Sequence, residues 1–239
     1  SVQAIHTLGN AVTAPTLGQP NRSNSALALF DEPLAGRLIE VVAPTALAQL
    51  REAALAALLS WSTLPDPLYR LDYTFTARLV AFAAEKLQAS QELRTLLRQL
   101  PPPTDPAARA DGLATLDQAI TRLSMHRARL AALRDEFAAC WLRHARRGGM
   151  EQTLNRFAAL DQRYQNALNW LSGQRARYAA AEPIDAELSS YTTGDYRALW
   201  EEGLANIREL ARLVGVEELP PDIRHYLERA GLLGGLSSA

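Results

Sequence analysis

A cluster of basic side chains is the part of this sequence whose residue types most directly suggest ligand binding. Residues 141–150 read WLRHARRGGM and hold Arg143, His144, Arg146 and Arg147 before two glycines. Guanidinium groups bind phosphates well, so the cluster could hold a phosphate or a nucleic-acid backbone. Basic residues in the last turn of a helix also interact favourably with its dipole, and a following glycine permits a left-handed cap. Because no aromatic side chain alternates with these arginines, as single-strand binding requires, we interpret the cluster as a helix end.

The residue types that bind metals are few and poorly spaced. The histidines are His6, His126, His144 and His225. No two of them lie four apart on one helix beside a third ligand, so the sequence predicts no zinc site. The single cysteine, Cys140, excludes an internal disulfide and a cysteine-based metal cluster. Its apolar surroundings, FAACWL, predict a buried and unreactive thiol.

Two Asp-Glu pairs suggest acid-base chemistry of the kind that glycosidases use. They are Asp31-Glu32 and Asp135-Glu136. Adjacent residues on a helix point about 100° apart, so Asp135 and Glu136 cannot converge on one substrate atom. We expect surface ion pairs there, for example between Glu136 and an arginine one helical turn away. Asp31-Glu32 precedes Pro33 and is interpreted as a helix start or a turn.

Common catalytic signatures are absent from the sequence. It contains no Gly-x-Ser-x-Gly elbow, no phosphate-binding loop and no dinucleotide fingerprint. From the residues alone we therefore predict no catalytic residue, no metal and no cofactor.

The elements that must carry these side chains are helices, because apolar residues recur at spacings of three and four. The fold predicted is an all-α bundle of about five to seven mostly antiparallel amphipathic helices with an irregular N-terminal segment. We predict long helices over residues 44–61, 68–97, 111–146, 150–178 and 196–215, and short ones over 35–42 and 223–231. The four tryptophans, Trp61, Trp141, Trp170 and Trp200, are expected to anchor the core.

Composition changes along the chain and suggests three regions. Residues 1–36 are rich in Gly, Pro, Asn, Ser and Thr, which predicts an irregular linker that packs on the bundle or on a missing domain. Residues 37–230 form the predicted helical bundle domain. Residues 231–239 are expected to form a flexible tail.

The overall charge argues against a dedicated nucleic-acid binder. The 239 residues carry 25 basic and 26 acidic side chains, for a net charge of −1. No apolar run approaches the ~20 residues of a membrane span, so no membrane partner is expected. With one cysteine and no visible signal peptide, the localisation predicted is soluble and cytoplasmic. Lys86 is the only lysine, which we attribute to compositional bias, and the absence of a starting methionine suggests a fragment.

Two stretches resemble the β-N-acetylhexosaminidases of glycoside hydrolase family 20. CWLRHARRGGMEQTLNRFAALDQRYQNAL is similar to a helix-turn-helix stretch of bacterial members, and HTLGNAVTAPTLGQPNRSNSALALF is similar to the coil that follows their catalytic barrel. The residues that carry the first match are Trp141, Leu142, Arg143, Arg146, Gly148 and Gly149. Those that carry the second are Leu8, Gly9, Asn10, Asn21 and Ser23.

The resemblance implies a part of such an enzyme without its catalytic centre. The family signature His-x-Gly-Gly-Asp-Glu is absent, and Asp31-Glu32 follows ALALF, so no catalytic role transfers to that pair. The chain would then be the non-catalytic C-terminal helical domain of a glycoside hydrolase. Its implied partner is the catalytic β/α barrel of the same polypeptide, or a second copy in a homo-oligomer. Candidate contacts with another domain or with an anion are Asn10, Asn21, Arg143, Arg146 and Arg147.

A second hypothesis belongs to a different functional class. Long amphipathic helices also build stand-alone interaction or scaffold proteins, whose apolar faces bind partner helices. Nucleic-acid binding, which we do not expect, would give an affinity that falls with salt and depends on Arg146 and Arg147.

Overall fold

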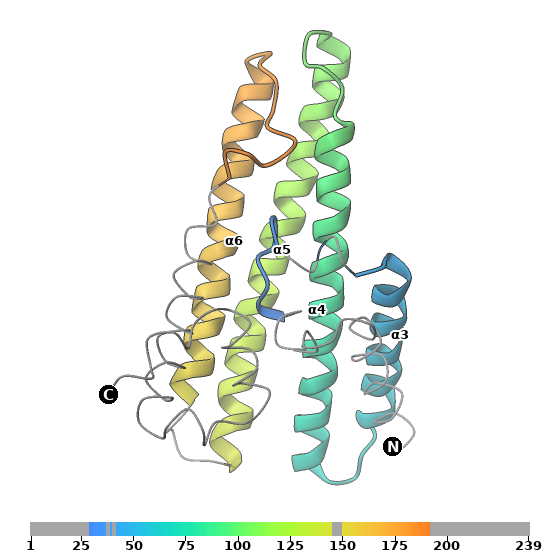
Figure 1. The fold of residues 1–239 in the computed structure, drawn as a ribbon. Coiled ribbons are helices and arrows are strands. Elements are labelled where there is room, and N and C mark those ends of the chain that lie inside the picture. The colour runs from blue at the N-terminus through green and yellow to red at the C-terminus, as the bar shows by residue number, and fades with distance from the viewer. Residues whose placement is uncertain (1–28, 37–38, 40–41, 145–149, 192–239) are drawn as a thin grey trace, which may run out of the picture. The chain divides into compact units, whose positions relative to one another are not determined.

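The computed structural model describes residues 29–36, 39, 42–144 and 150–191 (Figure 1). Within these residues the chain is all-helical, which confirms the predicted fold class. The helices are α3 (Pro44–Trp61), α4 (Pro67–Gln99), α5 (Pro106–His144) and α6 (Met150–Ala179). The chain separates into two units, residues 1–191 and 192–239, and every described residue belongs to the first.

The described residues contain four helices, whereas the sequence predicts five to seven for the whole chain. The helices predicted over 196–215 and 223–231 lie outside the described residues. The short helix predicted over 35–42 is wrong where it can be checked, because Ala35, Gly36, Ile39 and Val42 lie in turns, bends or coil. Backbone bonds that would extend a helix there are replaced by bonds to buried side chains, as shown below.

Proline and aspartate set the starts of the helices. Pro44 and Pro67 occupy first-turn positions, where a missing N–H costs nothing. Asp66 caps α4 by accepting a hydrogen bond from the backbone N–H of Leu68 at 2.8 Å. Asp105 accepts in the same way from Ala108 at 3.1 Å, so α5 begins at Pro106, five residues before the predicted start.

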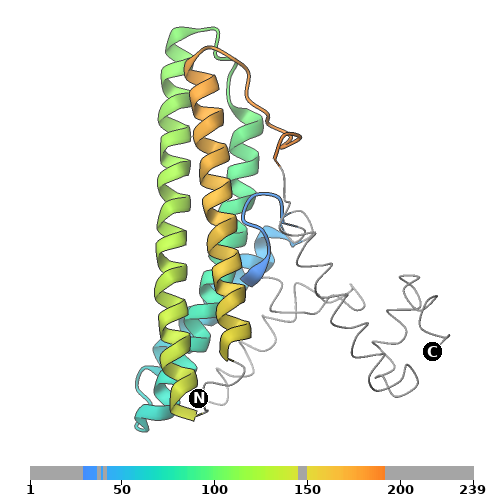
Figure 2. The ribbon, with the colours of Figure 1, turned by 90° about the vertical axis from the view of Figure 1, so that its left-hand side faces the viewer.

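Successive helices run antiparallel, as predicted. Figures 1 and 2 show α4, α5 and α6 side by side along most of their length, with α3 beside the first half of α4. One buried cluster of the α3–α4 contact consists of small residues and the ring of Trp61. These residues are Ala53, Ala54, Ala57, Trp61, Ala77 and Ala81.

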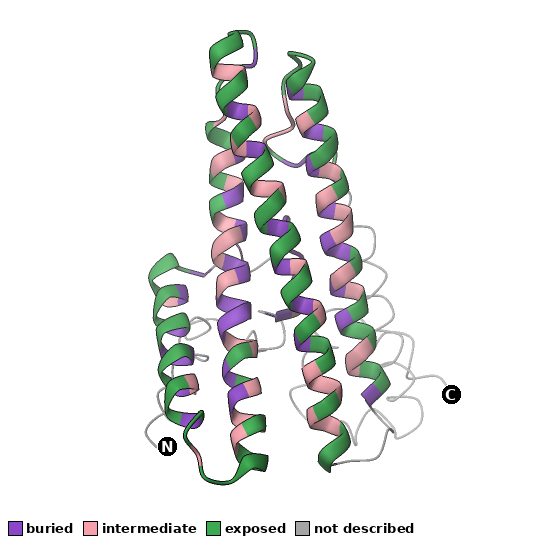
Figure 3. Ribbon diagram, turned by 180° about the vertical axis from the view of Figure 1, so that it is seen from behind, coloured by how far each residue is buried: buried purple, intermediate pink, exposed green. Residues whose placement is uncertain are grey.

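The main core lies where α4, α5 and α6 face one another, and buried positions follow the inner sides of these helices (Figure 3). Its largest fully buried side chains include Tyr164, Tyr178, Phe82 and Phe157. Trp61 is 2% exposed, as expected for an anchor, but Trp141 and Trp170 are only half-buried. Their expected place in the core is taken by Tyr164 and Tyr178. Trp200 lies outside the described residues.

Two segments outside α3–α6 cover this three-helix core, and the first is irregular except for helical residues at positions 29 and 30. We call residues 29–36 the N-terminal strap; its Leu29 and Leu34 are buried in the core cluster. Leu188, from the segment that follows α6, is buried in the same cluster. The two segments meet where the Tyr191 hydroxyl donates to Glu32 Oε1 at 2.6 Å. The polar groups at this meeting point form the site described next.

Candidate functional site

Lys86 lies at the centre of the most buried polar cluster among the described residues. Its position on α4 follows Phe82 by one turn, so the helix points both side chains toward the core. The side chain is 1% exposed. Its ammonium donates to the backbone oxygens of Leu29 at 2.9 Å and Asp31 at 2.6 Å. The only lysine of the chain therefore fastens the N-terminal strap to α4.

Glu32 uses both carboxylate oxygens to fix the shape of the strap. Oε2 accepts hydrogen bonds from the backbone N–H groups of Leu34, at 2.7 Å, and Ala35. Oε1 accepts the bond from Tyr191. Asp31 Oδ1 accepts from the Glu32 N–H at 3.1 Å. Of the two alternatives predicted for the Asp-Glu pair, a helix start or a turn, the structure has the turn, which follows the pair at residues 33–35, and both carboxylates are buried.

Two further side chains hold the strap from α4 and α6. Arg163 on α6 donates to the Phe30 oxygen at 2.6 Å, and Ser90 on α4 donates to the Pro33 oxygen at 2.5 Å. Gly36 permits this fit, because a Cβ atom there would lie 2.5 Å from Asp31 Oδ2. Seven of the strap's backbone groups are thus bonded to side chains, which explains why residues 31–36 need no helix.

The positive and negative charges of the cluster balance, but their burial costs free energy. Lys86 and Arg163 face Asp31 and Glu32, so two positive groups meet two negative ones in a site nearly free of water. Burial lowers the pKa of Lys86 to about 8, although both carboxylates oppose the change. Burial also raises the pKa of Glu32, against its hydrogen bonds and the charge of Lys86. Such groups are stable inside a protein only when paired and hydrogen-bonded.

An amine with a lowered pKa can act as a nucleophile or a base, but this one is poorly placed to do so. Its nitrogen already donates to two carbonyl oxygens. Three cavities on the described part of the chain, of about 620, 160 and 240 Å³, are not lined by Lys86. We therefore assign Lys86 a role in architecture.

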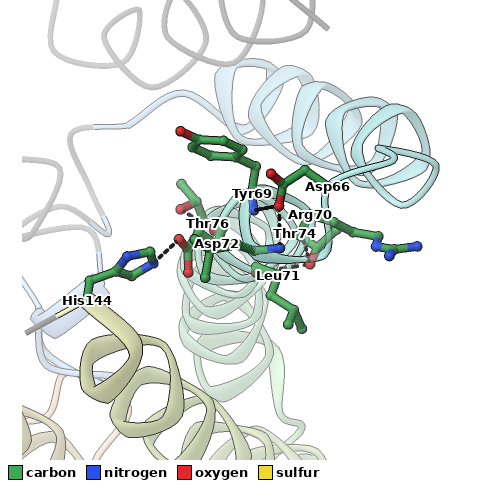
Figure 4. A network of polar contacts seen from close by, with 9 residues as sticks. Asp66, Tyr69, Arg70, Leu71, Asp72, Thr74, Thr76 and His144 are labelled. Atoms are coloured by element: carbon green, nitrogen blue, oxygen red, sulfur yellow. Dashed lines mark hydrogen bonds and ion pairs between the residues drawn. The ribbon is translucent and has the colours of Figure 1, made fainter.

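A second polar cluster lies where α5 ends beside the start of α4 (Figure 4). His144 Nε2 lies 2.5 Å from Asp72 Oδ2, and Figure 4 shows the imidazole pointing at this carboxylate. Cys140 lies one turn before His144, which gives the cluster the residue types of a cysteine nucleophile with its base. Burial and the nearby Asp72 charge raise the pKa of the thiol, however. A catalytic cysteine needs the opposite shift, so the prediction of an unreactive thiol is retained, although Cys140 is only half-buried.

Most of the residues predicted to contact another domain or an anion lie outside the described residues. Arg143 lies exposed in the last turn of α5, where its charge favours the helix dipole. Asn10, Asn21, Arg146 and Arg147 lie outside the described residues, so their predicted contacts stay predictions.

The surface ion pairs expected at Asp135-Glu136 are present. Arg134 bonds Asp135 at 2.9 Å. Glu136 pairs with Arg78 of α4 at 2.6 Å, not with an arginine one turn away on its own helix. The sequence prediction of the partner is wrong because a neighbouring helix brings a closer guanidinium than the same helix does.

The described part of the chain contains neither a metal-binding group of side chains nor a membrane-spanning helix. Among the described residues, no three His, Cys, Asp or Glu side chains are grouped to hold a metal ion. None of the four described helices combines the length and apolar character needed to cross a membrane.

Comparison with known proteins adds no relative: no family model, no curated protein and no solved structure matches this chain. The candidate site therefore stands on its geometry. Sequence reasoning missed Lys86, Arg163 and Tyr191 as partners of the strap. One signal was present, since the apolar stripe of α4 passes from Phe82 to Leu93 and is interrupted at Lys86 and Ser90.

Proposed function

We propose that this chain is a non-catalytic helical domain of a glycosidase similar to the family 20 β-N-acetylhexosaminidases. In that role it supports the catalytic barrel or mediates oligomerisation. The stretch of closest resemblance, residues 140–168, has its described parts in the end of α5 and the beginning of α6. Two antiparallel helices around a glycine pair are what the resemblance implies there, so this arrangement supports the proposal.

The main support for a non-catalytic role is that the buried charged groups form structural hydrogen bonds. Lys86, Glu32 and Arg163 bond backbone atoms of the strap or its turn. Their buried environments are of a kind that catalysis could exploit, but their bonds are committed to the fold. A supporting domain needs such fastening, since it must keep its shape while another domain moves or binds.

The test has two arms, which begin with the isolated chain. Incubated with an aryl N-acetylglucosaminide, it is expected to release no aryl alcohol above the uncatalysed rate, and turnover would contradict the proposal. The second arm reads the DNA upstream in the same frame. A β/α barrel with His-x-Gly-Gly-Asp-Glu is expected there. A variant of that longer protein without residues 37–230 should have a less stable barrel.

An exposed apolar surface favours the second function, a stand-alone interaction or scaffold protein. Leu59 of α3 is 74% exposed, and Leu55, one helical turn before it, is also exposed. Exposed apolar side chains that neighbour one another on a helix can form part of a protein interface. A start codon immediately before this chain would favour that function over the first. Light scattering of Leu59→Glu, with the exposed Met125→Glu as control, would then show whether this surface holds copies together.

A further inference from the structure

A cavity bounded by α3, α4 and α5 has a composition unlike the rest of the described surface. Its volume is about 240 Å³. Its charged and larger lining residues are Arg51, Glu85, Arg122, Met125, His126 and Arg129. Three arginines face Glu85 here and Glu92 in the adjoining cavity, so the two cavities together carry one net positive charge. A concave wall of low dielectric concentrates this positive potential.

The three arginines of this cavity keep N–H groups that can donate hydrogen bonds to a ligand. Arg122 and Arg129 each use Nη1 to pair with a glutamate of α4, Glu92 and Glu85 respectively. These pairs hold the two guanidinium groups in place. The other N–H groups of Arg122 and Arg129 have no hydrogen bond to a described residue. Arg51 comes from α3 and has no hydrogen bond or ion pair with any described residue. Guanidinium forks of this kind match the oxygens of a phosphate.

His126 supplies an independent sign that a ligand belongs here. It lies on α5 between Arg122 and Arg129, lines the cavity, and is only 8% exposed. Its Nδ1 atom is buried and has no hydrogen-bond partner among the described residues. Burial and the charge of Arg129 lower the pKa of the imidazole. An unsatisfied buried nitrogen beside excess positive charge is costly, and an anion would relieve both.

A second cavity of about 160 Å³ adjoins the first and shares Arg122 and His126 with it. The rest of its wall consists of two polar residues, Glu92 and Gln118, and of the apolar residues Ala89, Leu93, Leu96, Ala119 and Leu123. The two cavities together offer a positive compartment next to an apolar one.

We propose that these paired cavities bind a small organic phosphate. The phosphate dianion lies against Arg51, Arg122 and Arg129, and the organic group enters the apolar cavity. The guanidinium groups decide the class of anion, since their N–H groups match the oxygens of a phosphate. This site is independent of the proposed function, because it requires neither a barrel nor an oligomer.

The test follows the His126 ring by NMR while a probe is added, with His126→Gln used to assign its signals among the four histidines. The probes are inorganic phosphate and phenyl phosphate. Both are expected to shift the His126 signals saturably and to raise its pKa by about half a unit or more, because bound negative charge favours the imidazolium. Phenyl phosphate is expected to bind about tenfold more tightly, since its ring can leave water in the apolar cavity.

Three variants make the test specific. Arg51→Gln should weaken phenyl phosphate about tenfold, and it cannot disturb a structural bond because Arg51 makes none with a described residue. Leu123→Ala should weaken phenyl phosphate but not inorganic phosphate. The control is Arg78→Gln, an exposed arginine that lines none of the three cavities, and it should leave both affinities unchanged. Absence of saturable shifts, equal binding of the two probes, or equal weakening by Arg78→Gln would each overturn the proposal.

Discussion

The two charged regions beside α4 use similar side chains in opposite ways. In the cluster under the N-terminal strap, Lys86 is enclosed and its donors are bonded to backbone oxygens. In the cavity next to α3, Arg51 is exposed and has no partner among the described residues. The first region is neutral overall and costs free energy unless every bond is made, whereas the second is positive and leaves donors unused. Charge balance and burial, more than residue type, therefore separate the structural site from the candidate binding site.

The largest effect expected is that of Lys86→Met. The variant removes the ammonium and leaves the Leu29 and Asp31 oxygens and two buried carboxylates without it. Breaking a buried ionic cluster from one side costs about 3–5 kcal/mol. Urea unfolding at pH 7 should show this loss. A loss below about 1 kcal/mol would mean that the strap does not depend on Lys86, and the contrast between the two regions would fail.

Gly36→Ala is expected to have the next largest effect. The added methyl would lie 2.5 Å from Asp31 Oδ2, so the strap must move away from its bonds. Overpacking of this kind costs about 1–3 kcal/mol. Gly173→Ala is the matched control, because no atom lies within 4 Å of the added methyl and alanine favours the helix. Thermal unfolding should rank Gly36→Ala below the natural chain and Gly173→Ala at or above it.

A pH series measures the cost of burying the Lys86 charge. The folded pKa is about 8, below the ordinary value of 10.5, so between these values the unfolded chain binds more protons than the folded one. The free energy of unfolding due to Lys86 therefore rises with pH, by about 1.4 kcal/mol per unit at most. Cys140 and the buried tyrosines have raised pKa values, so their titrations lower the free energy of unfolding as pH rises. Subtracting the free energy of unfolding of Lys86→Met from that of the natural chain at each pH removes these contributions. A difference that stays flat from pH 8 to 10 would contradict the burial of a charged amine.

The smallest effect belongs to the cavity. Arg51→Gln removes a side chain without a described partner, so the free energy of unfolding should change by less than about 0.5 kcal/mol. Chemical denaturation measures this directly. A loss of several kcal/mol would show that Arg51 is structural and would erase the distinction drawn above.

The helices could be predicted because their signals are local. The spacing of apolar residues and the glycine and proline breaks placed α3 at its observed bounds and α4 and α6 within two residues of theirs. The start of α5 was placed too late because the prolines before it suggested a connector, while the Asp105 cap allows a helix from Pro106.

The strap could not be predicted, because its structure depends on distant partners. Arg163 is 133 residues from Phe30 in the sequence, and Tyr191 is 159 residues from Glu32. No periodic pattern links such residues. The composition of the first 36 residues predicted an irregular segment correctly for residues 31–36, but it gave no sign that the segment enters the core. Only the interruption of the α4 stripe at Lys86 and Ser90 pointed to a polar partner.

The central claim is that Lys86 is a buried ammonium that fastens the strap, and one measurement tests it most directly. Because Lys86 is the only lysine, a chain grown with ¹⁵N-labelled lysine gives a single side-chain amine signal, which can be titrated without assignment. The structure predicts a midpoint near pH 8, well below the 10.5 of free lysine, and slow exchange of the amine protons with water. A midpoint near 10.5 with fast exchange would show an amine in solvent and would contradict the account.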